Sequence, residues 1–405
     1  MFKYHCRNFV KISMNKWYKQ IFQMDFGPIE WRPKFATKQG ENALCAPTPF
    51  LAIKEEEMMK NMNKMMELMK QWPNVDLRPH FKAHKSVDIA KQQIKLGAVG
   101  ICCQTLTEAE SAVYGGSIED VFISNEVIGV GKVKRVVQLA LKSKISICVD
   151  NEENIKDLSQ LAKESNANLD LVIEVNVGQD RCGIKPGADV VPLAKLVESL
   201  PNVHFKGIQA YHGWNQHVRS AAERKERTNT VAGLAQKTVE CLQSANIKCP
   251  YITGGGTGTF PYEAGTGLFT EIQPGSYVFM DADYNRNLNE KETFYSGFVQ
   301  SLFIYTTVQS ITGDERAVVD SGMKAASLDS GPPLVAGKED SVIYHSGGDE
   351  HGILRPNDGF KVGQVIQLIP GHCDPTVNLH DVYYLIDGNE KVKAILPVNA
   401  RDAGV

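Results

Sequence analysis

The segment ISICVDNEENIKDLSQLAKESNANLDLVIEVNV, residues 145–177, decides the class of fold. Its two ends, Ile145–Val149 and Leu171–Val177, are short apolar runs of the kind that form buried strands. Between them, Ile155–Glu164 places its apolar residues at helical spacing. A strand, a helix and a second strand in this order predict a βαβ unit in which the two strands run parallel.

The same alternation extends from about residue 75 to residue 285. The further candidate strands are Leu77–His84, Val99–Cys103, Val121–Ser124, Gly207–His212, Tyr251–Gly254 and Ile272–Phe279. The helical patterns between them include Val87–Leu96, Leu106–Tyr114, Gly131–Leu141 and Val190–Leu200. Eight such strands in succession predict a closed (β/α)8 TIM-like barrel rather than an open sheet, which makes the fold class α/β.

After about residue 290 the chain becomes rich in short β-type segments separated by Gly, Pro and Asp. These segments are Phe294–Thr307, Arg316–Val319, Val365–Ile369 and Val382–Ile386. They predict a second, mostly β domain that follows the barrel. We therefore expect an N-terminal extension over residues 1–46, a barrel over 47–285 and a β domain over 286–405.

Charge and composition exclude several classes of function. A net charge of −3 gives no electrostatic case for binding nucleic acid or a membrane surface, and no run of 18 apolar residues is present to span a bilayer. Nine cysteines without a regular framework indicate a reducing compartment, so we expect a cytoplasmic protein. Residues 1–24 are basic and contain no acid, which fits either a mitochondrial transit peptide or a plain basic extension.

The segment RPHFKAHK, residues 78–85, contains the first candidate for chemistry. On a strand, His80, Lys82 and His84 would share one face. Desolvation lowers the pKa of a buried lysine and so favours the neutral amine that attacks a carbonyl carbon. The alternative is an exposed edge strand with a solvated basic face.

The segment ITGGGTGT, residues 252–259, directly follows a candidate strand. Its glycines allow the backbone to approach an anion and to direct several N–H groups at it, and the flanking threonine hydroxyls can add donors. Late in a (β/α)8 barrel, such a loop is the usual place for a phosphate group. A plain tight turn is the alternative.

The segment GHCDPTVN, residues 371–378, offers a possible metal site. His372 and Asp374 are two residues apart, so they would lie on one side of an extended segment and could share a divalent cation. The alternative is an ordinary core or turn histidine. Arg181, Tyr211 and His217 lie at or just past candidate strand ends, where barrel active sites are built, although Arg181 and His217 also fit surface positions.

These segments, taken in order, resemble the D-threonine aldolase and D-serine dehydratase-like family of fold-type III pyridoxal-phosphate enzymes. The resemblance runs from Thr48-Pro49 to near the C-terminus. Besides the glycine run, its motifs are RPHxKxHK at Arg78–Lys85, GQxRCG at Gly178–Gly183, QAYHG at Gln209–Gly213, DSGMKA at Asp320–Ala325, EHG at Glu350–Gly352 and GHCDPTVNL at Gly371–Leu379.

The resemblance implies two cofactors, pyridoxal 5′-phosphate and a divalent metal ion. Lys82 matches the lysine that holds the cofactor covalently, with His80 beside it. Arg181 matches an arginine near the cofactor's phenolic oxygen, and Tyr211 matches a tyrosine that lines the cofactor. The matches to the phosphate cradle are Thr253, Gly254, Gly255, Gly256, Thr257 and Gly258.

The same resemblance assigns the metal and the catalytic base. His372 and Asp374 match the metal pair, and His217 matches the histidine that takes a proton from the substrate's β-hydroxyl. The carboxylate of the pair favours Mn²⁺ or Mg²⁺, with Zn²⁺ as an alternative. The family also implies a homodimer in which each site is completed by both subunits.

The expected activity is retro-aldol cleavage of a small D-3-hydroxy amino acid, with D-threonine giving glycine and acetaldehyde. A D-serine or D-threo-3-hydroxyaspartate dehydratase, which would release a 2-oxo acid and ammonia, shares nearly every residue. Dehydratases resembling this chain tend to carry a His-x-Cys metal pair, whereas residue 374 is an aspartate here. A non-catalytic pyridoxal-phosphate protein is a minor alternative, and a racemase is a further one.

Overall fold

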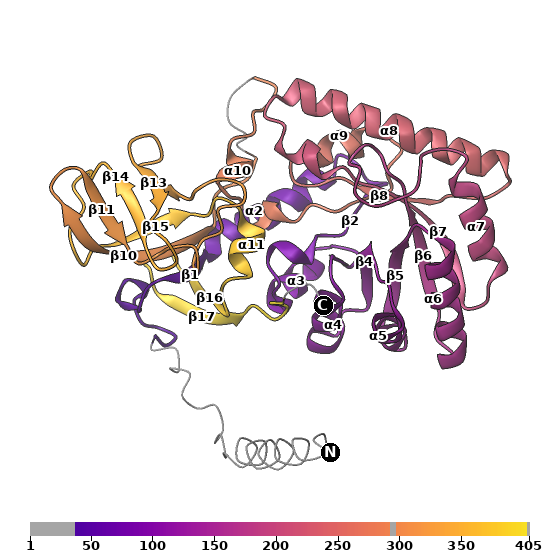
Figure 1. Ribbon diagram of the computed structural model, residues 1–405, viewed down its shortest axis with the longest axis horizontal. Helices are drawn as coiled ribbons and strands as arrows, with labels where there is room; N and C mark the ends of the chain where they lie inside the picture. The colour runs from indigo at the N-terminus through magenta and orange to yellow at the C-terminus, as the bar shows by residue number, and fades with distance from the viewer. Residues whose placement is uncertain (1–36, 292–296, 403–405) are drawn as a thin grey trace, which may run out of the picture. The chain divides into compact units, whose positions relative to one another are not determined.

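The computed structural model describes residues 37–291 and 297–402. Eight parallel strands follow one another around a barrel (Figure 1). They are β2 (Asp76–Leu77), β3 (Ile101–Cys103), β4 (Asp120–Glu126), β5 (Lys144–Val149), β6 (Leu169–Glu174), β7 (Val203–Ala210), β8 (Tyr251–Gly254) and β9 (Glu271–Ile272). The ring closes where Val99 N–H donates to Leu77 O at 3.0 Å and where His80 bridges to Cys102. The expected (β/α)8 barrel is confirmed.

Helices follow the strands and lie outside the ring (Figure 1). They are α3 (Val87–Lys95), α4 (Leu106–Glu110) with the π-helical turn Ser111–Gly115, α5 (Val130–Ala140), α6 (Glu152–Ser165), α7 (Val190–Ser199), α8 (Ala221–Ser244) and α9 (Phe260–Gly265). Helix α2 (Glu55–Met69) precedes β2. Alternate strand residues face inward and outward: Phe122 and Cys148 belong to an inner apolar cluster, whereas Ile123 and Ile147 pack with the helices. Both strand faces are therefore buried, which is why these strands are continuous apolar runs.

A second sheet of nine strands contains the C-terminal part of the chain. Its strands are β1 (Phe50–Lys54), β10 (Leu302–Thr312), β11 (Arg316–Val319), β12 (Leu334–Val335), β13 (Ile343–Ser346), β14 (Gly352–Arg355), β15 (Val365–Ile369), β16 (Val382–Ile386) and β17 (Val392–Pro397). Strand β1 comes before the whole barrel in the sequence, yet it pairs with β10 antiparallel and with β16 parallel. The mostly β second domain is confirmed, with two short helices near the site, α10 (Ala282–Asn285) and α11 (Cys373–Val377).

One apolar core spans elements of both sheets. Leu51 and Ile53 of β1 belong to the same cluster as the buried methionines of α2. Phe279, after the last barrel strand, and Tyr383 of β16 belong to it as well, with their ring centroids 5.7 Å apart. The proposed boundary at residue 285 therefore crosses a continuous core, and the domain limits stay a prediction.

Two candidate strands are shorter than expected. In the segment Leu77–His84 the regular strand ends at Leu77, and Pro79 has no N–H to offer the ladder. Backbone hydrogen bonds continue to His80, whose N–H donates to Pro274 O at 3.2 Å, and Phe81–Ala83 then forms a 3-10 helix. The segment Ile272–Phe279 likewise ends at Ile272, two residues before Pro274. The prediction that Lys82 stands on a strand, on one face with its histidine neighbours, is wrong.

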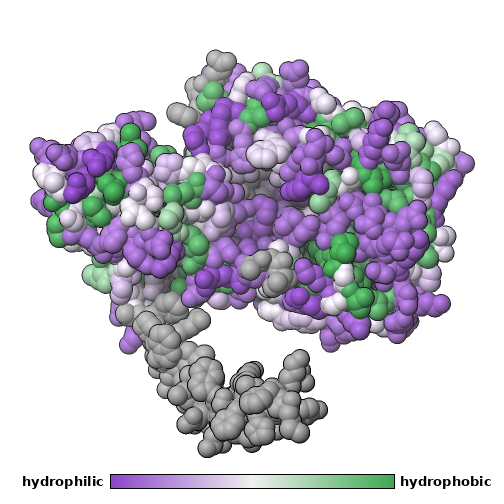
Figure 2. All heavy atoms as spheres, in the orientation of Figure 1, coloured by the Kyte–Doolittle hydropathy of each residue, from purple (hydrophilic) through white to green (hydrophobic). Residues whose placement is uncertain are grey.

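The surface gives no sign of a membrane span in the part of the chain that the structure describes, where no helix is long and apolar enough to cross a bilayer. On the face shown in Figure 2, apolar residues lie in small groups between hydrophilic ones.

All eight cysteines in the described ranges are free. The basic segment 1–24, for which we considered a transit peptide, lies outside the described residues, and the cytoplasmic location stays a prediction.

Candidate active site

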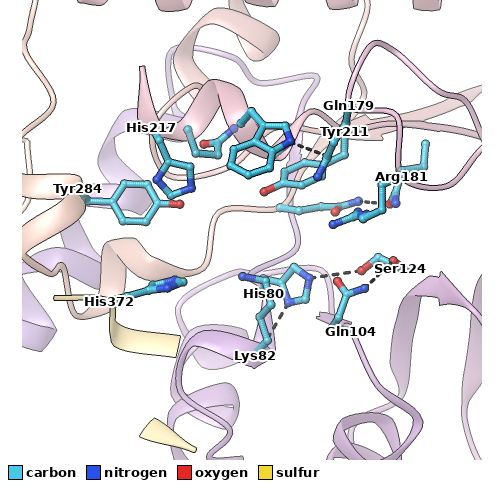
Figure 3. Close-up of a pocket in the computed structure, with 15 residues that line it drawn as sticks. His80, Lys82, Gln104, Ser124, Gln179, Arg181, Tyr211, His217, Tyr284 and His372 are labelled. Atoms are coloured by element: carbon cyan, nitrogen blue, oxygen red, sulfur yellow. Dashed lines mark hydrogen bonds between the residues drawn. The ribbon is translucent and has the colours of Figure 1, made fainter. Parts of the chain in front are cut away.

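A cavity of roughly 230 Å³ opens at the C-terminal ends of the barrel strands, where barrel enzymes place their active sites. In Figure 3, His217, Tyr284 and His372 lie on one side of it and Arg181 on the other. Lys82 and His80 lie between these two sides (Figure 3). The sequence-predicted residues that line the cavity are His80, Lys82, Arg181, Tyr211, His217 and His372.

Lys82 projects from the 3-10 helix Phe81–Ala83, and its Nζ forms an ion pair with Asp374. Burial lowers the pKa of Lys82, but the Asp374 carboxylate more than offsets this, so the pKa lies above its ordinary value. The prediction of a lowered pKa is therefore wrong for this structure, since it took no account of a carboxylate from the other domain. The pair does show that Lys82 and the predicted metal residue Asp374 share one site.

His80 fixes the backbone next to Lys82. Its Nδ1 accepts the Lys82 N–H at 3.4 Å, which leaves the ring proton on Nε2 facing Ser124 Oγ at 3.3 Å. Burial and the Lys82 charge lower the pKa of His80 well below its ordinary value, so the ring is neutral. His84 instead points into the core, where it contacts Gln93 at 3.2 Å, and burial lowers its pKa to about 4.

Arg181 stands on a closed loop that follows β6. The loop is pinned where Asn176 N–H donates to Ile184 O at 2.8 Å and Ile184 N–H donates to Glu174 O at 3.0 Å. Gly183 has φ +95°, and a Cβ there would lie 2.7 Å from Asn176 N, so this position requires glycine. The final glycine of the GQxRCG motif thus determines where Arg181 projects.

Tyr211 and two glutamines form another wall of the cavity. Burial raises the pKa of Tyr211, so its phenol is neutral. Gln273 Nε2 donates to Gln209 Oε1 at 3.1 Å and to Thr253 Oγ1 at 2.7 Å. The Thr253 hydroxyl donates in turn to Glu271 at 3.0 Å, so it is engaged inside the barrel rather than offered to a phosphate.

The glycine loop after β8 has the backbone of an anion site. Gly255 has φ +71°, and a Cβ on Gly256 would lie 2.6 Å from the Gln216 Oε1 atom. Gly258 N–H donates to that same Gln216 oxygen at 2.9 Å. Gln216 thus occupies an N–H group of the loop, and Gly254, Gly255, Gly256 and Gly258 are not among the residues that line the cavity, so the phosphate cradle stays a prediction. Thr257 Oγ1 accepts the Tyr277 N–H at 3.0 Å and keeps its own hydroxyl proton to donate.

His217 lies at the end of the 3-10 helix Gly213–His217, where its Nδ1 is bonded to Asp283. Asp283 also binds Arg219 and, at 3.0 Å, Arg286. Burial alone would raise the pKa of Asp283, but His217 and Arg219 lower it to about 2, so it is ionised. The carboxylate holds the ring proton on Nδ1 and leaves Nε2 as the group that can accept a proton.

His372 and Asp374 are placed by the start of a helix rather than by an extended strand. His372 is the residue before α11, and Asp374 lies in its first turn, so the expected extended segment is wrong. The two charges still act on each other: Asp374 offsets the effect of burial and raises the pKa of His372. Cys373, between them, is fully buried in the core.

A carboxylate also orients the His372 ring. His372 Nδ1 lies 2.7 Å from Asp329 Oδ2, which leaves Nε2 able to bind a cation. Our sequence analysis missed both orienting carboxylates, Asp329 and Asp283. The two aspartates Asp281 and Asp283, close together after the last candidate strand, were a possible signal for Asp283. Nothing in the sequence near Asp329 indicates its pairing with His372.

Three comparisons with known proteins agree with this geometry. The model of the alanine racemase N-terminal domain matches residues 53–283, and that of the putative serine dehydratase domain matches residues 301–386. The chain is 41% identical over 366 residues to a D-threonine aldolase of an Arthrobacter species, covering 89% of this chain and 94% of that protein. It is 40% identical to a 3-hydroxy-D-aspartate aldolase of Paracoccus denitrificans, covering 88% and 92%.

The solved structures give the same result. The crystal structure of D-threonine aldolase from Filomicrobium marinum superposes with a TM-score of 0.86 at 38% identity, covering 90% of this chain and 98% of that one. A D-threo-3-hydroxyaspartate dehydratase of a Delftia species is more distant, at 25% identity over 371 residues. Fold and site thus define a lyase of the alanine racemase-like, fold-type III pyridoxal-phosphate class. Within that class, the chain belongs to the D-threonine aldolase and D-serine dehydratase-like family.

Proposed function

We propose that this protein cleaves D-3-hydroxy amino acids between Cα and Cβ with the help of pyridoxal phosphate and a divalent metal ion. D-threonine would give glycine and acetaldehyde. The observation that carries the proposal is the convergence on one cavity of Lys82, His217 and the His372–Asp374 pair.

The cavity fits pyridoxal phosphate. Lys82 would provide the amine, and Arg181 and Tyr211 line the same cavity. Gln216, which also lines it, accepts the Gly258 N–H, and a phosphate would take its place on the glycine loop. When bound, the cofactor supplies an electron sink for the pair of electrons left on Cα when the bond breaks. The neutral His80 ring keeps a second positive charge away from Lys82.

A divalent cation fits the imidazole and carboxylate of His372 and Asp374. No cluster of three or more His, Cys, Asp or Glu suited to a metal occurs within residues 37–291 and 297–402, so water and substrate oxygens would complete the shell. Such a cation supplies Lewis-acid chemistry that lowers the pKa of a bound hydroxyl. The oxygen and nitrogen donors favour Mn²⁺ or Mg²⁺, with Zn²⁺ as an alternative.

His217 would act as the general base. Its Nδ1 proton is held by Asp283, so Nε2 accepts the proton of the β-hydroxyl as the Cα–Cβ bond breaks. Tyr284 is buried, and its ring packs near His217, with the centroids 6.0 Å apart. This packing limits the rotation of the imidazole.

The dehydratase remains the second candidate, because it needs the same cofactors and nearly the same residues. Two observations favour the aldolase: an aspartate stands at position 374, and three curated relatives of 39% to 41% identity are aldolases. A homodimer is part of the proposal, supported by the family resemblance.

Product analysis with D-threonine tests the proposal. We expect glycine and acetaldehyde in equal amounts, full loss of turnover with EDTA, and recovery with Mn²⁺. Release of 2-oxobutanoate and ammonia would instead establish the dehydratase. Repeating the assay with D-serine and D-3-hydroxyaspartate ranks the β-substituents, and L-threonine serves as the stereochemical control.

A further inference from the structure

Two of the sequence motifs end in residues that have no role in the proposed site. The motif that contains Lys82 ends in Lys85, and it follows the barrel strand β2. The motif that contains His372 and Asp374 ends in Asn378, and it belongs to the C-terminal β domain. The family resemblance gave neither end residue a role, yet the fold brings the two side chains into contact.

Lys85 is buried against the C-terminal part of the chain, with 8% of its surface exposed. Its Nζ donates to three acceptors, which are Asn378 Oδ1 at 2.9 Å, Ala400 O at 3.2 Å and Asp402 Oδ1 at 3.4 Å. An ammonium group has three N–H donors, so the number of acceptors matches. The carboxylates of Asp402 and of Glu108, the latter at 3.6 Å, compensate the charge, as a buried lysine requires.

The backbone of Lys85 is fixed as well as its side chain. Its N–H donates to Phe81 O at 2.7 Å across the 3-10 helix that carries Lys82, and its carbonyl oxygen accepts the Ala400 N–H at 3.3 Å. Lys85 has φ +47°, a left-handed conformation that a residue with a side chain adopts only at a cost. Such a conformation persists where surrounding contacts hold it, and here those contacts come from the β domain.

Asn378 is fixed on the other side of the contact. It is the residue that follows α11, the helix whose first turn contains Asp374. Its Nδ2 donates to Asp402 O at 2.9 Å, and its backbone oxygen accepts from Arg401 Nε at 2.9 Å. These bonds orient the amide so that Oδ1 faces Lys85. Asn378 therefore joins the segment of the predicted metal pair to the segment of the predicted cofactor lysine.

We propose that Lys85 is a positioning residue, which through Asn378 fixes the distance between the amine of Lys82 and the predicted metal pair. Lys82 itself forms an ion pair with Asp374, but its amine would not be available for this contact while it holds the cofactor. The bond from Lys85 to Asn378 uses neither of these side chains. It would therefore keep the two segments in register when the site is loaded.

The proposed reaction explains why this distance matters. The substrate would be held at two points, with its amino group at the cofactor on Lys82 and its β-oxygen at the cation. Only two carbon atoms separate that nitrogen from that oxygen, so the substrate cannot stretch to follow a shift of one segment. A displacement of about 1 Å at reacting groups can cost on the order of 100-fold in rate. The inference rests on the proposed function in this respect, whereas the bond from Lys85 to Asn378 does not depend on it.

Amide hydrogen exchange without cofactor or metal tests the bond between the segments. Lys85→Met keeps the length of the side chain but removes the charge and the three donors. Asn378→Ala removes the acceptor without changing the charge. We expect faster exchange over residues 81–85 and 373–378 in both variants, because each segment loses the contact that holds it.

Asn154→Ala is the matched control for this measurement. The Asn154 side chain is also buried, and its Nδ2 also donates to a backbone oxygen, that of Val127 at 2.9 Å. This bond joins α6 to the residue after β4, so both of its ends lie within the barrel. The control should leave exchange in the two segments unchanged. Unchanged exchange in Asn378→Ala overturns the proposal, even where Lys85→Met fails to fold.

The distance is measured in the enzyme loaded with pyridoxal phosphate and Mn²⁺. The paramagnetic ion speeds the relaxation of the cofactor's phosphorus nucleus, by an amount that falls with the sixth power of their separation. We expect this relaxation to differ from the wild type in Lys85→Met and Asn378→Ala, and to equal it in Asn154→Ala. The affinity for pyridoxal phosphate should not change, since neither Lys85 nor Asn378 lines the cavity. Relaxation equal to that of the wild type in both variants overturns the positioning role.

Kinetics with D-threonine separate positioning from binding. For Asn378→Ala we expect kcat to fall by about 10- to 100-fold with a smaller change in KM, and for Asn154→Ala we expect the wild-type kcat. The double variant Lys85→Met/Asn378→Ala should be no slower than Lys85→Met, because both changes remove one bond. A double variant whose loss equals the product of the single losses overturns the role of that bond. A wild type that binds no pyridoxal phosphate or leaves D-threonine uncleaved would refute the proposed function, while the exchange result would still decide the bond.

Discussion

Two histidines at the cavity are each held by a carboxylate that lies far away in the sequence. Asp283 binds His217, and Asp329 binds His372. In each pair the carboxylate fixes the ring proton on Nδ1, so the Nε2 atom is available for a proton or a cation. The histidines could be singled out from their local motifs, whereas the carboxylates depend on folding, since 66 and 43 residues separate the partners.

Asp329→Asn tests whether the second of these pairs supports a metal site. The amide keeps the size of the side chain but cannot hold the His372 ring as a charged acceptor does. We expect the affinity for Mn²⁺ to fall by about 10- to 100-fold, because partners of metal ligands have effects of this size. Isothermal titration of EDTA-treated protein measures it, with Asp358→Asn, which removes an exposed partner of Lys338, as the control. Equal affinity in the two variants would contradict the role of Asp329.

Asp283→Asn tests a pH-dependent contribution to stability. The folded-state pKa of Asp283 is about 2, below its ordinary value of 3.8, so the ionised carboxylate stabilises the fold above about pH 4. That contribution disappears as the pH falls towards 2. The shift corresponds to about 2 kcal/mol, so the variant should lose about this much free energy of unfolding at pH 7.

Urea unfolding at several pH values checks this prediction. The difference between wild type and Asp283→Asn should be constant from pH 7 to pH 5 and should shrink below pH 4. Asp157→Asn, on the exposed face of α6, is the matched control and should match the wild type throughout. A difference that grows on acidification would contradict the sign of the shift.

At the scale of single elements, the strand ends decide the site. Pairing with the neighbouring strands ends at His80, and the following 3-10 helix turns Lys82 towards Asp374. Eight strands could be located from apolar runs and their spacing, but not the points where they stop, because a strand end depends on whether its neighbours still offer partners. The segment around His372 shows the same limit: a helix begins where an extended run was expected.

The loop after β6 tests the link between backbone geometry and the position of Arg181. Gly183→Ala would force a side chain into φ +95° and within 2.7 Å of Asn176 N. We expect a loss of about 1–3 kcal/mol in the free energy of unfolding and weaker cofactor binding, because Arg181 would be displaced. Gly131→Ala in α5, where a Cβ meets nothing within 4 Å, is the control and should change stability by less than about 1 kcal/mol. Thermal melts without pyridoxal phosphate measure the loss of stability. The further rise in melting temperature when pyridoxal phosphate is added measures how strongly the cofactor binds.

At the scale of the whole molecule, the two sheets are joined by their core. Leu51, Ile53 and the methionines of α2 pack with residues of both sheets. The barrel and the β domain could be foreseen from the sequence because each has its own periodicity. The place of β1 could not, since nothing in the five residues Phe50–Lys54 identifies the distant strands β10 and β16 as its partners.

A shared core predicts one cooperative unfolding transition for residues 39–402. Differential scanning calorimetry of the wild type should give a single peak, and the isolated segment 39–291 should not fold, because β1 and one side of α2 would lose their partners. Two resolved peaks, or a folded isolated barrel, would contradict this prediction.

The pairing of β1 also bears on how the chain is made. A ribosome releases Phe50–Lys54 early, but both neighbouring strands, β10 and β16, belong to the last third of the chain. At about 5–20 residues per second, β1 waits on the order of tens of seconds with its edges unpaired. An apolar strand exposed for that long is a binding site for chaperones that act on nascent chains. The barrel strands can pair with neighbours as they emerge, so the second sheet is the last part of the molecule to be completed and the part most exposed to error during synthesis.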